Sequence, residues 1–138
     1  MQCILRIIFL VSGVVAVWPY GMPVVAPEIG HIIRHFHDDV IGHYWQPENR
    51  LIDKEYSTIP FPFRRIATPG FTIQRDMELP GILALVRNWS AVQRFVDKER
   101  RDPVTQLENG LAKLWGAQED KRYSSWQLIL LVGRNMNR

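Results

Sequence analysis

The chain of 138 residues has the length of one domain and the composition of a globular protein, with 46% hydrophobic and 22% charged residues. Its formal net charge is only +3, and basic and acidic residues alternate along the chain, so the charge does not predict a nucleic-acid partner. The single cysteine, Cys3, excludes an internal disulfide, and no apolar run reaches the roughly 18 residues that cross a bilayer, so no membrane partner is expected.

The first predicted element is an apolar run that ends at Trp18. Residues 7–17 are apolar apart from Ser12 and Gly13, and a short basic segment precedes them. On composition alone, the run fits a cleaved export signal of about residues 1–16, which would make the mature chain a small secreted binding protein. The other interpretation is a buried strand in a cytoplasmic protein.

The next predicted element is a helix that begins at Pro27, a residue favoured in the first helical turn. Apolar residues follow at helical spacing on one face: Ile29, Ile32, Ile33, Phe36, Val40, Ile41 and Tyr44. Trp45, Gln46 and Pro47 end this helix.

All four histidines lie between His31 and His43, within the same predicted helix. His31 and His35 are one turn apart, which is the spacing of metal ligands on a helix. The apolar stripe, however, leaves much of the histidine set on the polar side. We therefore expect a solvated helical face and no metal site.

The middle of the chain predicts an extended segment and then a strand. Residues 56–63 contain Pro60 and Pro62 among aromatic and aliphatic residues, which excludes a helix interior. Residues 71–79 alternate apolar and polar side chains, which is typical of a half-buried strand.

Two helices and a final strand complete the predicted elements. Pro80 opens a long helix whose apolar positions are Ile82, Leu83, Leu85, Val86, Trp89, Val92, Phe95 and Val96. After a break at Asp102 and Pro103, a shorter amphipathic helix runs from Val104 to Trp115 and ends at Gly116. The last strand, residues 126–132, is continuously apolar, which predicts a central position in a sheet.

The order of strand, helix, extended segment, strand, two helices and strand predicts an α/β layer structure. Three strands form a poor sheet on their own, so the chain is expected to be part of a larger fold.

Several motifs agree in order and spacing with one family: "GVVAVWPYGMPVV", a helix ending in "YW", "PFPF", "NWSAVQRF" and "WQLILLVGR". Together they resemble the C-terminal half of class I S-adenosylmethionine-dependent methyltransferases, nearest to the trans-aconitate methyltransferase-like group. The resemblance covers residues 13–134. It implies residues 1–12 as an atypical N-terminal segment and 13–138 as the C-terminal portion of the methyltransferase domain.

The resemblance implies a partial Rossmann-like sheet with helices and a helical lid. In the family, the fifth, sixth and seventh strands would correspond to residues 14–18, 71–78 and 126–132. The seventh strand lies between the other two, and the last two strands are antiparallel. Residues 14–18 and 71–78 are therefore expected to flank residues 126–132, each pairing with them in the antiparallel sense.

The family binds S-adenosylmethionine with a glycine-rich turn after its first strand and an acidic residue after its second. The glycines of this chain are scattered singly, and Val11, Ser12 and Gly13 stand where the family has Pro-Gly-Gly. The resemblance thus implies a truncated or split enzyme without cofactor-binding residues and inactive alone. It is expected to self-associate or to pair with the missing N-terminal half.

The substrate-side residues implied by the resemblance would hold a small-molecule methyl acceptor such as a carboxylic acid. Tyr20 follows the first strand, at the end of the strand where open α/β sheets bind ligands. Arg87 could pair with an anionic acceptor, with Trp89 and Ser90 beside it in the sequence. Catalytic residues are not assigned, because methylation of a carboxylate needs positioning more than acid–base chemistry.

Each of these residues also has a structural interpretation that the sequence leaves open. Tyr44 and Trp45 could form a wall of the acceptor pocket or pack in the core. Tyr20 could pack on the following helix, Trp89 could be buried within the helical layer, and Arg87 could be solvated.

Overall fold

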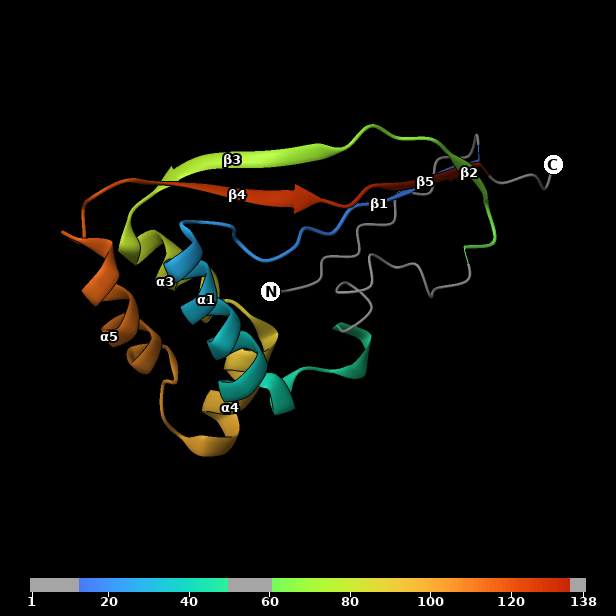
Figure 1. Ribbon diagram of the computed structural model, residues 1–138. Coiled ribbons are helices and arrows are strands. Elements are labelled where there is room, and N and C mark those ends of the chain that lie inside the picture. Colours follow the sequence, from blue (N-terminus) through green and yellow to red (C-terminus); the bar gives the residue numbers. More distant parts are fainter. Residues whose placement is uncertain (1–12, 50–60, 135–138) are drawn as a thin grey trace. The chain divides into compact units, whose positions relative to one another are not determined.

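The computed structural model describes residues 13–49 and 61–134, which divide into two compact units. The helical unit contains residues 23–46 and 74–125. The strand unit contains residues 13–22, 47–49, 61–73 and 126–134. Figure 1 follows the chain through the elements of both units. The atypical segment 1–12, which carries most of the proposed export signal, and residues 56–60 of the extended segment lie outside the described residues.

The strand unit contains a three-stranded antiparallel sheet. It is formed by β1 (Val14–Val17), β5 (Leu131–Arg134) and β2 (Arg64–Ile66), in the order β1-β5-β2. The register places Val14 opposite Arg134 and Val17 opposite Leu131. Antiparallel pairing of the first and last strands, as predicted, is confirmed.

A second sheet consists of β3 (Phe71–Met77) and β4 (Arg122–Leu128), which run in opposite directions (Figure 1). On its other side, β4 forms isolated antiparallel bridges through Leu128 to Tyr20 and through Ser125 to Val24. Strand β3 therefore pairs with β4, which contains only residues 126–128 of the predicted partner strand. The prediction that residues 14–18 and 71–78 flank one strand is wrong, because the second neighbour of β5 is β2.

The single last strand that we predicted over residues 126–132 is wrong, because β4 and β5 belong to different sheets. Ile129 and Leu130 separate them. The Ile129 N–H donates to the Pro19 carbonyl at 2.9 Å, and the Leu130 carbonyl accepts from the Thr68 hydroxyl at 3.0 Å. These hydrogen bonds satisfy backbone groups of the two linking residues, which do not belong to either strand. Because both linking residues are apolar, the sequence pattern did not reveal the break.

The first helix of the helical unit changes its winding along its length. It begins as α1 (Pro27–His35), continues as the π-helix η1 (Phe36–Val40) and is followed by a 3₁₀ turn, η2 (Gly42–Tyr44). The Ile41 N–H donates to the carbonyl of Phe36 at 3.1 Å, five residues earlier. The regular helix predicted up to Tyr44 is thus correct only in its first part. A further 3₁₀ turn, η3 (Pro47–Asn49), lies in the strand unit.

The long helix predicted from Pro80 is two helices, α3 (Leu79–Arg87) and α4 (Ser90–Glu99). Asn88 ends α3 and its side-chain amide donates to the Ala84 carbonyl at 2.9 Å. Trp89 then adopts an extended conformation, with φ −66° and ψ 133°. The apolar periodicity continues across the break, since Val86, Trp89 and Val92 are all buried, and this hid the break in the sequence.

The predicted helix after Pro103 is confirmed as α5 (Val104–Trp115), which ends at Gly116 with φ 94°. Helix α5 packs against both α1 and α3. Its buried face consists of Val104, Leu107, Leu111 and Trp115. The helices cover one side of the strand segments in this unit, where Ser124 of β4 is fully buried (Figure 1). Within residues 13–49 and 61–134, no helix has the length and apolar character that a membrane span requires.

Candidate functional site

Four aromatic rings of the helical unit form a cluster, called here the aromatic cluster: Phe36, His37, Trp45 and Trp89. The centroid of the Trp45 ring lies 5.9 Å from that of Trp89 and 4.7 Å from that of His37. The His37 ring meets Trp89 edge-on at 5.5 Å, and Phe36 lies 6.5 Å from Trp89. Two of the predicted acceptor-site residues, Trp45 and Trp89, are thus neighbours.

Irregular backbone in two segments, the end of the first helix and the break between α3 and α4, creates this arrangement. The π-helix η1 carries Phe36 and His37, and such turns inserted into α-helices are frequent at functional sites. Trp45 follows the 3₁₀ turn η2, and its indole N–H donates to the His37 carbonyl at 3.1 Å. Trp89 enters from the break between α3 and α4, where only 4% of its surface remains exposed. For Trp89, the structure therefore supports the interpretation as a buried residue.

His37 is a cluster member that the sequence pattern did not predict. We expected the histidines on a solvated face, yet the His37 side chain is only 15% exposed. Its Nδ1 lies 2.6 Å from Oδ1 of Asp38. The sequence contained one indication that His37 is sheltered. It is four residues after the buried Ile33 and therefore borders the apolar stripe of the helix.

Tyr44 begins a polar extension of the cluster toward α4. Its hydroxyl donates to Oε1 of Glu99 at 2.7 Å, and its carbonyl accepts from Nη1 of Arg94 at 3.1 Å. The ring lies 4.9 Å from that of Phe95, between centroids, and the ammonium of Lys98 stands 5.6 Å from the Tyr44 centroid.

The hydrogen bond to the Glu99 carboxylate is the main cause that raises the pKa of Tyr44 above its ordinary value of 10.0. Partial loss of solvent and the negative charge of Glu99 act in the same direction, and Arg101 acts against them. Tyr44 is therefore held as a neutral phenol that donates to a carboxylate.

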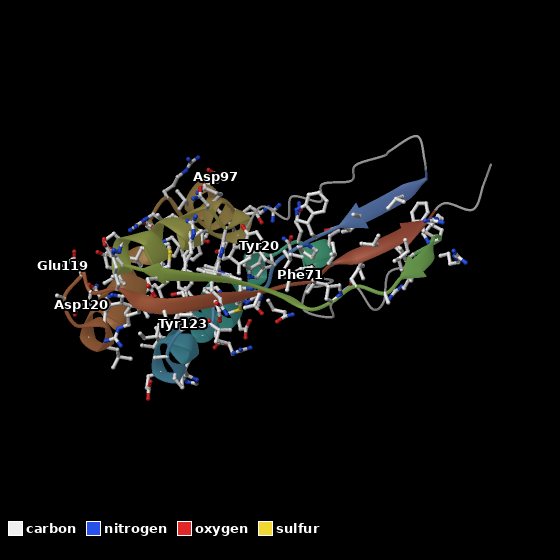
Figure 2. The ribbon with its side chains drawn as sticks, turned by 90° about the horizontal axis from the view of Figure 1, so that it is seen from above. Tyr20, Phe71, Asp97, Glu119, Asp120 and Tyr123 are labelled. Atoms are coloured by element: carbon white, nitrogen blue, oxygen red, sulfur yellow. The ribbon has the colours of Figure 1, made fainter. Side chains whose placement is uncertain are left out.

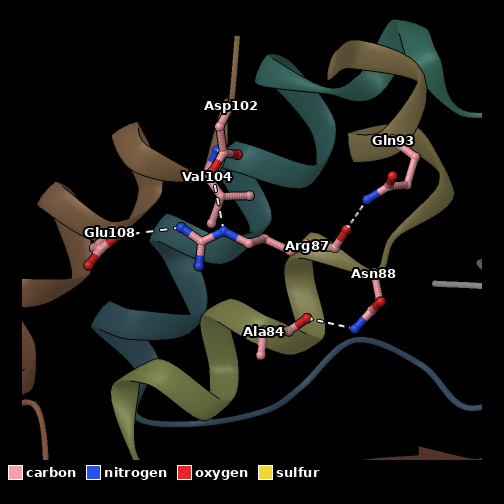
Figure 3. Close-up of polar contacts among 7 residues, drawn as sticks. All are labelled: Ala84, Arg87, Asn88, Gln93, Asp102, Val104 and Glu108. Atoms are coloured by element: carbon pink, nitrogen blue, oxygen red, sulfur yellow. Dashed lines mark hydrogen bonds and ion pairs between the residues drawn. The ribbon is translucent and has the colours of Figure 1, made fainter. Parts of the chain in front are cut away.

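Arg87 points toward Asp102 and toward Glu108 of α5 (Figure 3). Its Nε lies 3.2 Å from Oδ2 of Asp102, and its Nη2 lies 3.5 Å from Oε2 of Glu108. The Arg87 carbonyl also accepts from the amide of Gln93 at 2.7 Å. One positive charge thus faces two carboxylates, and the role of Arg87 in binding an anionic acceptor stays a prediction.

The two remaining predicted residues lie in different places. Ser90 is the first residue of α4 and is half-buried next to Trp89. Tyr20 belongs to the strand unit, where its bridge to Leu128 fixes its position and its side chain is exposed. Figure 2 labels Tyr20 and Phe71, another exposed aromatic residue of that unit.

A metal centre has no support in the described part of the chain. No group of three or more His, Cys, Asp or Glu side chains there is placed to hold an ion. His35, one of the two histidines at ligand spacing, instead contacts Oδ2 of Asp39 through its Nδ1 at 2.6 Å. This contact is exposed and lies within one helical turn.

Comparisons with known proteins give partial matches to putative methyltransferases, and no model of a protein family matches the chain. A Dictyostelium discoideum protein named "Putative methyltransferase" is 22% identical over 107 residues, covering 75% of this chain and 41% of that protein. A solved structure from Anaeromyxobacter dehalogenans, described as a "Putative Type II Methyltransferase", matches with a TM-score of 0.79 and 26% identity. That match covers 88% of this chain and 52% of the other, so the chain spans about half the length of the proteins that it matches or less.

Proposed function

We propose that this chain, a distant homologue of methyltransferases, is the C-terminal, substrate-side part of an S-adenosylmethionine-dependent methyltransferase that acts on a small molecule. The structural match over 88% of the chain is the observation that carries the proposal. It is supported by the antiparallel pairing of β1 with β5, which the resemblance implied.

The acceptor side is proposed to be built from the aromatic residues of the helical unit. Trp45 and Tyr44 are half-buried, so their rings combine a packed side with a side that reaches solvent. Such amphipathic rings are common walls of small-molecule sites. Trp89 supports Trp45 from below the surface, and Ser90 extends the same segment. Tyr20 remains a proposed acceptor residue of the strand unit.

The described residues do not fit the usual site for S-adenosylmethionine. Such a site needs closely spaced glycines that let the backbone approach the cofactor. Here Gly21 lies alone after β1, and Gly30 lies inside α1, where an added Cβ atom would meet no atom of another element within 4 Å. We therefore assign no residue of this chain to the cofactor and derive no chemical step from it.

The proposal is tested by joining this chain to the part of the Anaeromyxobacter protein that it does not match. The joined protein is expected to bind S-adenosylmethionine and to form S-adenosylhomocysteine with a member of an acceptor panel. The panel contains trans-aconitate, benzoate and phenol, which cover carboxylate and hydroxyl acceptors. Product formation is measured by chromatography and mass spectrometry.

The two separate parts, alone and mixed, serve as controls for the joined protein. A folded joined protein that binds the donor but forms no product with any acceptor would contradict the substrate-side role. A Trp45→Ala version is expected to lose product formation while donor binding is kept, because Trp45 is assigned to the acceptor side only.

A further inference from the structure

Two histidines of the first helix make the same contact in opposite surroundings. His35 and His37 each place Nδ1 2.6 Å from a carboxylate oxygen, of Asp39 and Asp38 respectively. The His35 side chain is 61% exposed, whereas that of His37 is 15% exposed. Only His37 therefore combines a fixed ring orientation with a sheltered position.

The contact with Asp38 determines which nitrogen of His37 is available. An ionised carboxylate only accepts hydrogen bonds, so Nδ1 of the neutral ring must carry the proton. The opposite nitrogen, Nε2, then has a free lone pair, as in histidines whose second nitrogen is oriented by a carboxylate. Among the described residues, Nε2 has no hydrogen-bond partner. No buried polar side-chain atom there is left unsatisfied, so Nε2 keeps contact with solvent.

The neighbouring indole rings surround the hydrogen-bond acceptor Nε2 of His37 with apolar surface. Trp45 packs along the His37 ring at 4.7 Å with an interplanar angle of 37°, and Trp89 closes another side edge-on. Trp45 is itself only half-buried. The His37 and Trp45 rings are therefore neighbours, and both are only half-buried.

We infer that His37 and Trp45 form a binding site for a neutral aromatic molecule with a hydroxyl group, whose O–H donates to Nε2 of His37. The inference rests on the proposed function and names the acceptor class: an aromatic alcohol or phenol. A carboxylate acceptor is disfavoured, because it has no hydrogen to donate to Nε2 and would approach the exposed carboxylate of Asp38. Arg87, the residue predicted to pair with an anionic acceptor, contacts Asp102 and Glu108.

The test measures binding of three matched probes to the 138-residue chain by NMR. Phenol has both the ring and the donor, anisole has the ring but lacks the donor, and benzoate has the ring with a negative charge. Phenol is expected to shift the side-chain signals of Trp45 and His37 and to bind more tightly than the other two. The preference over anisole should be about fivefold to tenfold, the usual contribution of one hydrogen bond.

Two variants locate this preference on one nitrogen. His37→Phe keeps a ring between the indoles but removes Nε2, so phenol and anisole should then bind equally. His35→Phe removes the matched histidine–carboxylate contact on the surface and should leave the preference unchanged. Thermal unfolding checks that both variants are folded.

A second measurement on the unaltered chain needs no variant. Two-bond proton–nitrogen spectra at pH 8 are expected to show Nδ1 of His37 protonated and Nε2 unprotonated. Equal binding of phenol and anisole by the unaltered chain, tighter binding of benzoate, no binding of phenol, or a proton on Nε2 would each overturn the inference. None of these measurements uses the methyl donor. A negative result here would overturn the phenol site without contradicting the proposed function, and a failed methyl-transfer test would not contradict the phenol site.

Discussion

At the scale of single residues, Tyr44 connects η2 to α4 through both its hydroxyl and its carbonyl. The hydroxyl donates to Glu99, and the carbonyl accepts from Arg94. Trp45, the next residue, donates to the carbonyl of His37. Hydrogen bonds to specific partners thus fix two adjacent aromatic residues. The proposed acceptor site therefore has a defined geometry, although these residues do not lie in a long helix.

This geometry predicts how pH affects the Tyr44 contact. Because the pKa of Tyr44 is raised, the folded state favours the protonated phenol. The stabilisation is fully present below the ordinary value of 10.0 and is lost as pH rises through the higher folded value. The free energy difference between the unaltered chain and Tyr44→Phe, measured by urea unfolding, should be constant from pH 7 to just below pH 10 and decrease above it.

Glu99→Gln identifies the cause of the raised pKa. Removing the negative charge should lower the pKa of Tyr44 toward its ordinary value, because the charged acceptor and its Coulomb effect are lost together. Absorbance at about 295 nm follows tyrosinate formation, and the exposed Glu119→Gln serves as the matched control (Figure 2). An unchanged titration in Glu99→Gln would show that Glu99 does not hold the phenol.

The sequence predicted only part of this residue-level picture. The apolar pattern was sufficient to predict the burial of Trp89, since hydrophobic spacing reports on burial even where the helix is broken. It could not predict the pairing of Arg87 with Asp102 and Glu108, because those partners come from beyond α4. It also missed His37, whose environment depends on a π-helix that single-residue propensities do not encode.

At the scale of elements, the end of α5 depends on one backbone conformation. Gly116 has φ 94°, and a Cβ atom there would lie 2.6 Å from Oδ2 of Asp120. That same oxygen accepts from the N–H of Ala117 at 2.9 Å, and the Asp120 carbonyl accepts from the Trp115 indole at 2.9 Å. The turn therefore holds the buried Trp115 in place as well as ending the helix.

Gly116→Ala is expected to destabilise the chain by about 1–3 kcal/mol, because alanine must adopt a backbone region that is nearly exclusive to glycine. The matched control is Gly110→Ala within α5, where a Cβ would meet Cγ2 of Ile32 at an ordinary 3.5 Å. This control should be neutral or stabilising by up to about 1 kcal/mol, since alanine favours helix. Equal destabilisation by both changes, in thermal or urea unfolding, would contradict this account of the turn.

The elements themselves were predicted best where periodicity and end signals agreed. Helix α5 has a clear apolar face, a proline before it and a glycine after it, and its bounds were correct. The division of the last apolar segment into β4 and β5, and the short strand β2, depend on pairing with distant residues. Local sequence carries little information on such pairing.

At the scale of the whole molecule, the chain matches about half of a methyltransferase-like structure. The described residues include the paired strands and the helices with the aromatic cluster, but no group of glycines suited to the cofactor. The proposed division of labour follows: this chain recognises the acceptor, and a region corresponding to the unmatched half of its homologues binds the methyl donor.

Calorimetric titration of the 138-residue chain with S-adenosylmethionine tests this division most directly. We predict no saturable binding in the micromolar range, in a sample whose folding is verified by circular dichroism, together with donor binding by the joined protein. Saturable micromolar binding by the chain alone would contradict the claim, because it would place a complete donor site within these 138 residues.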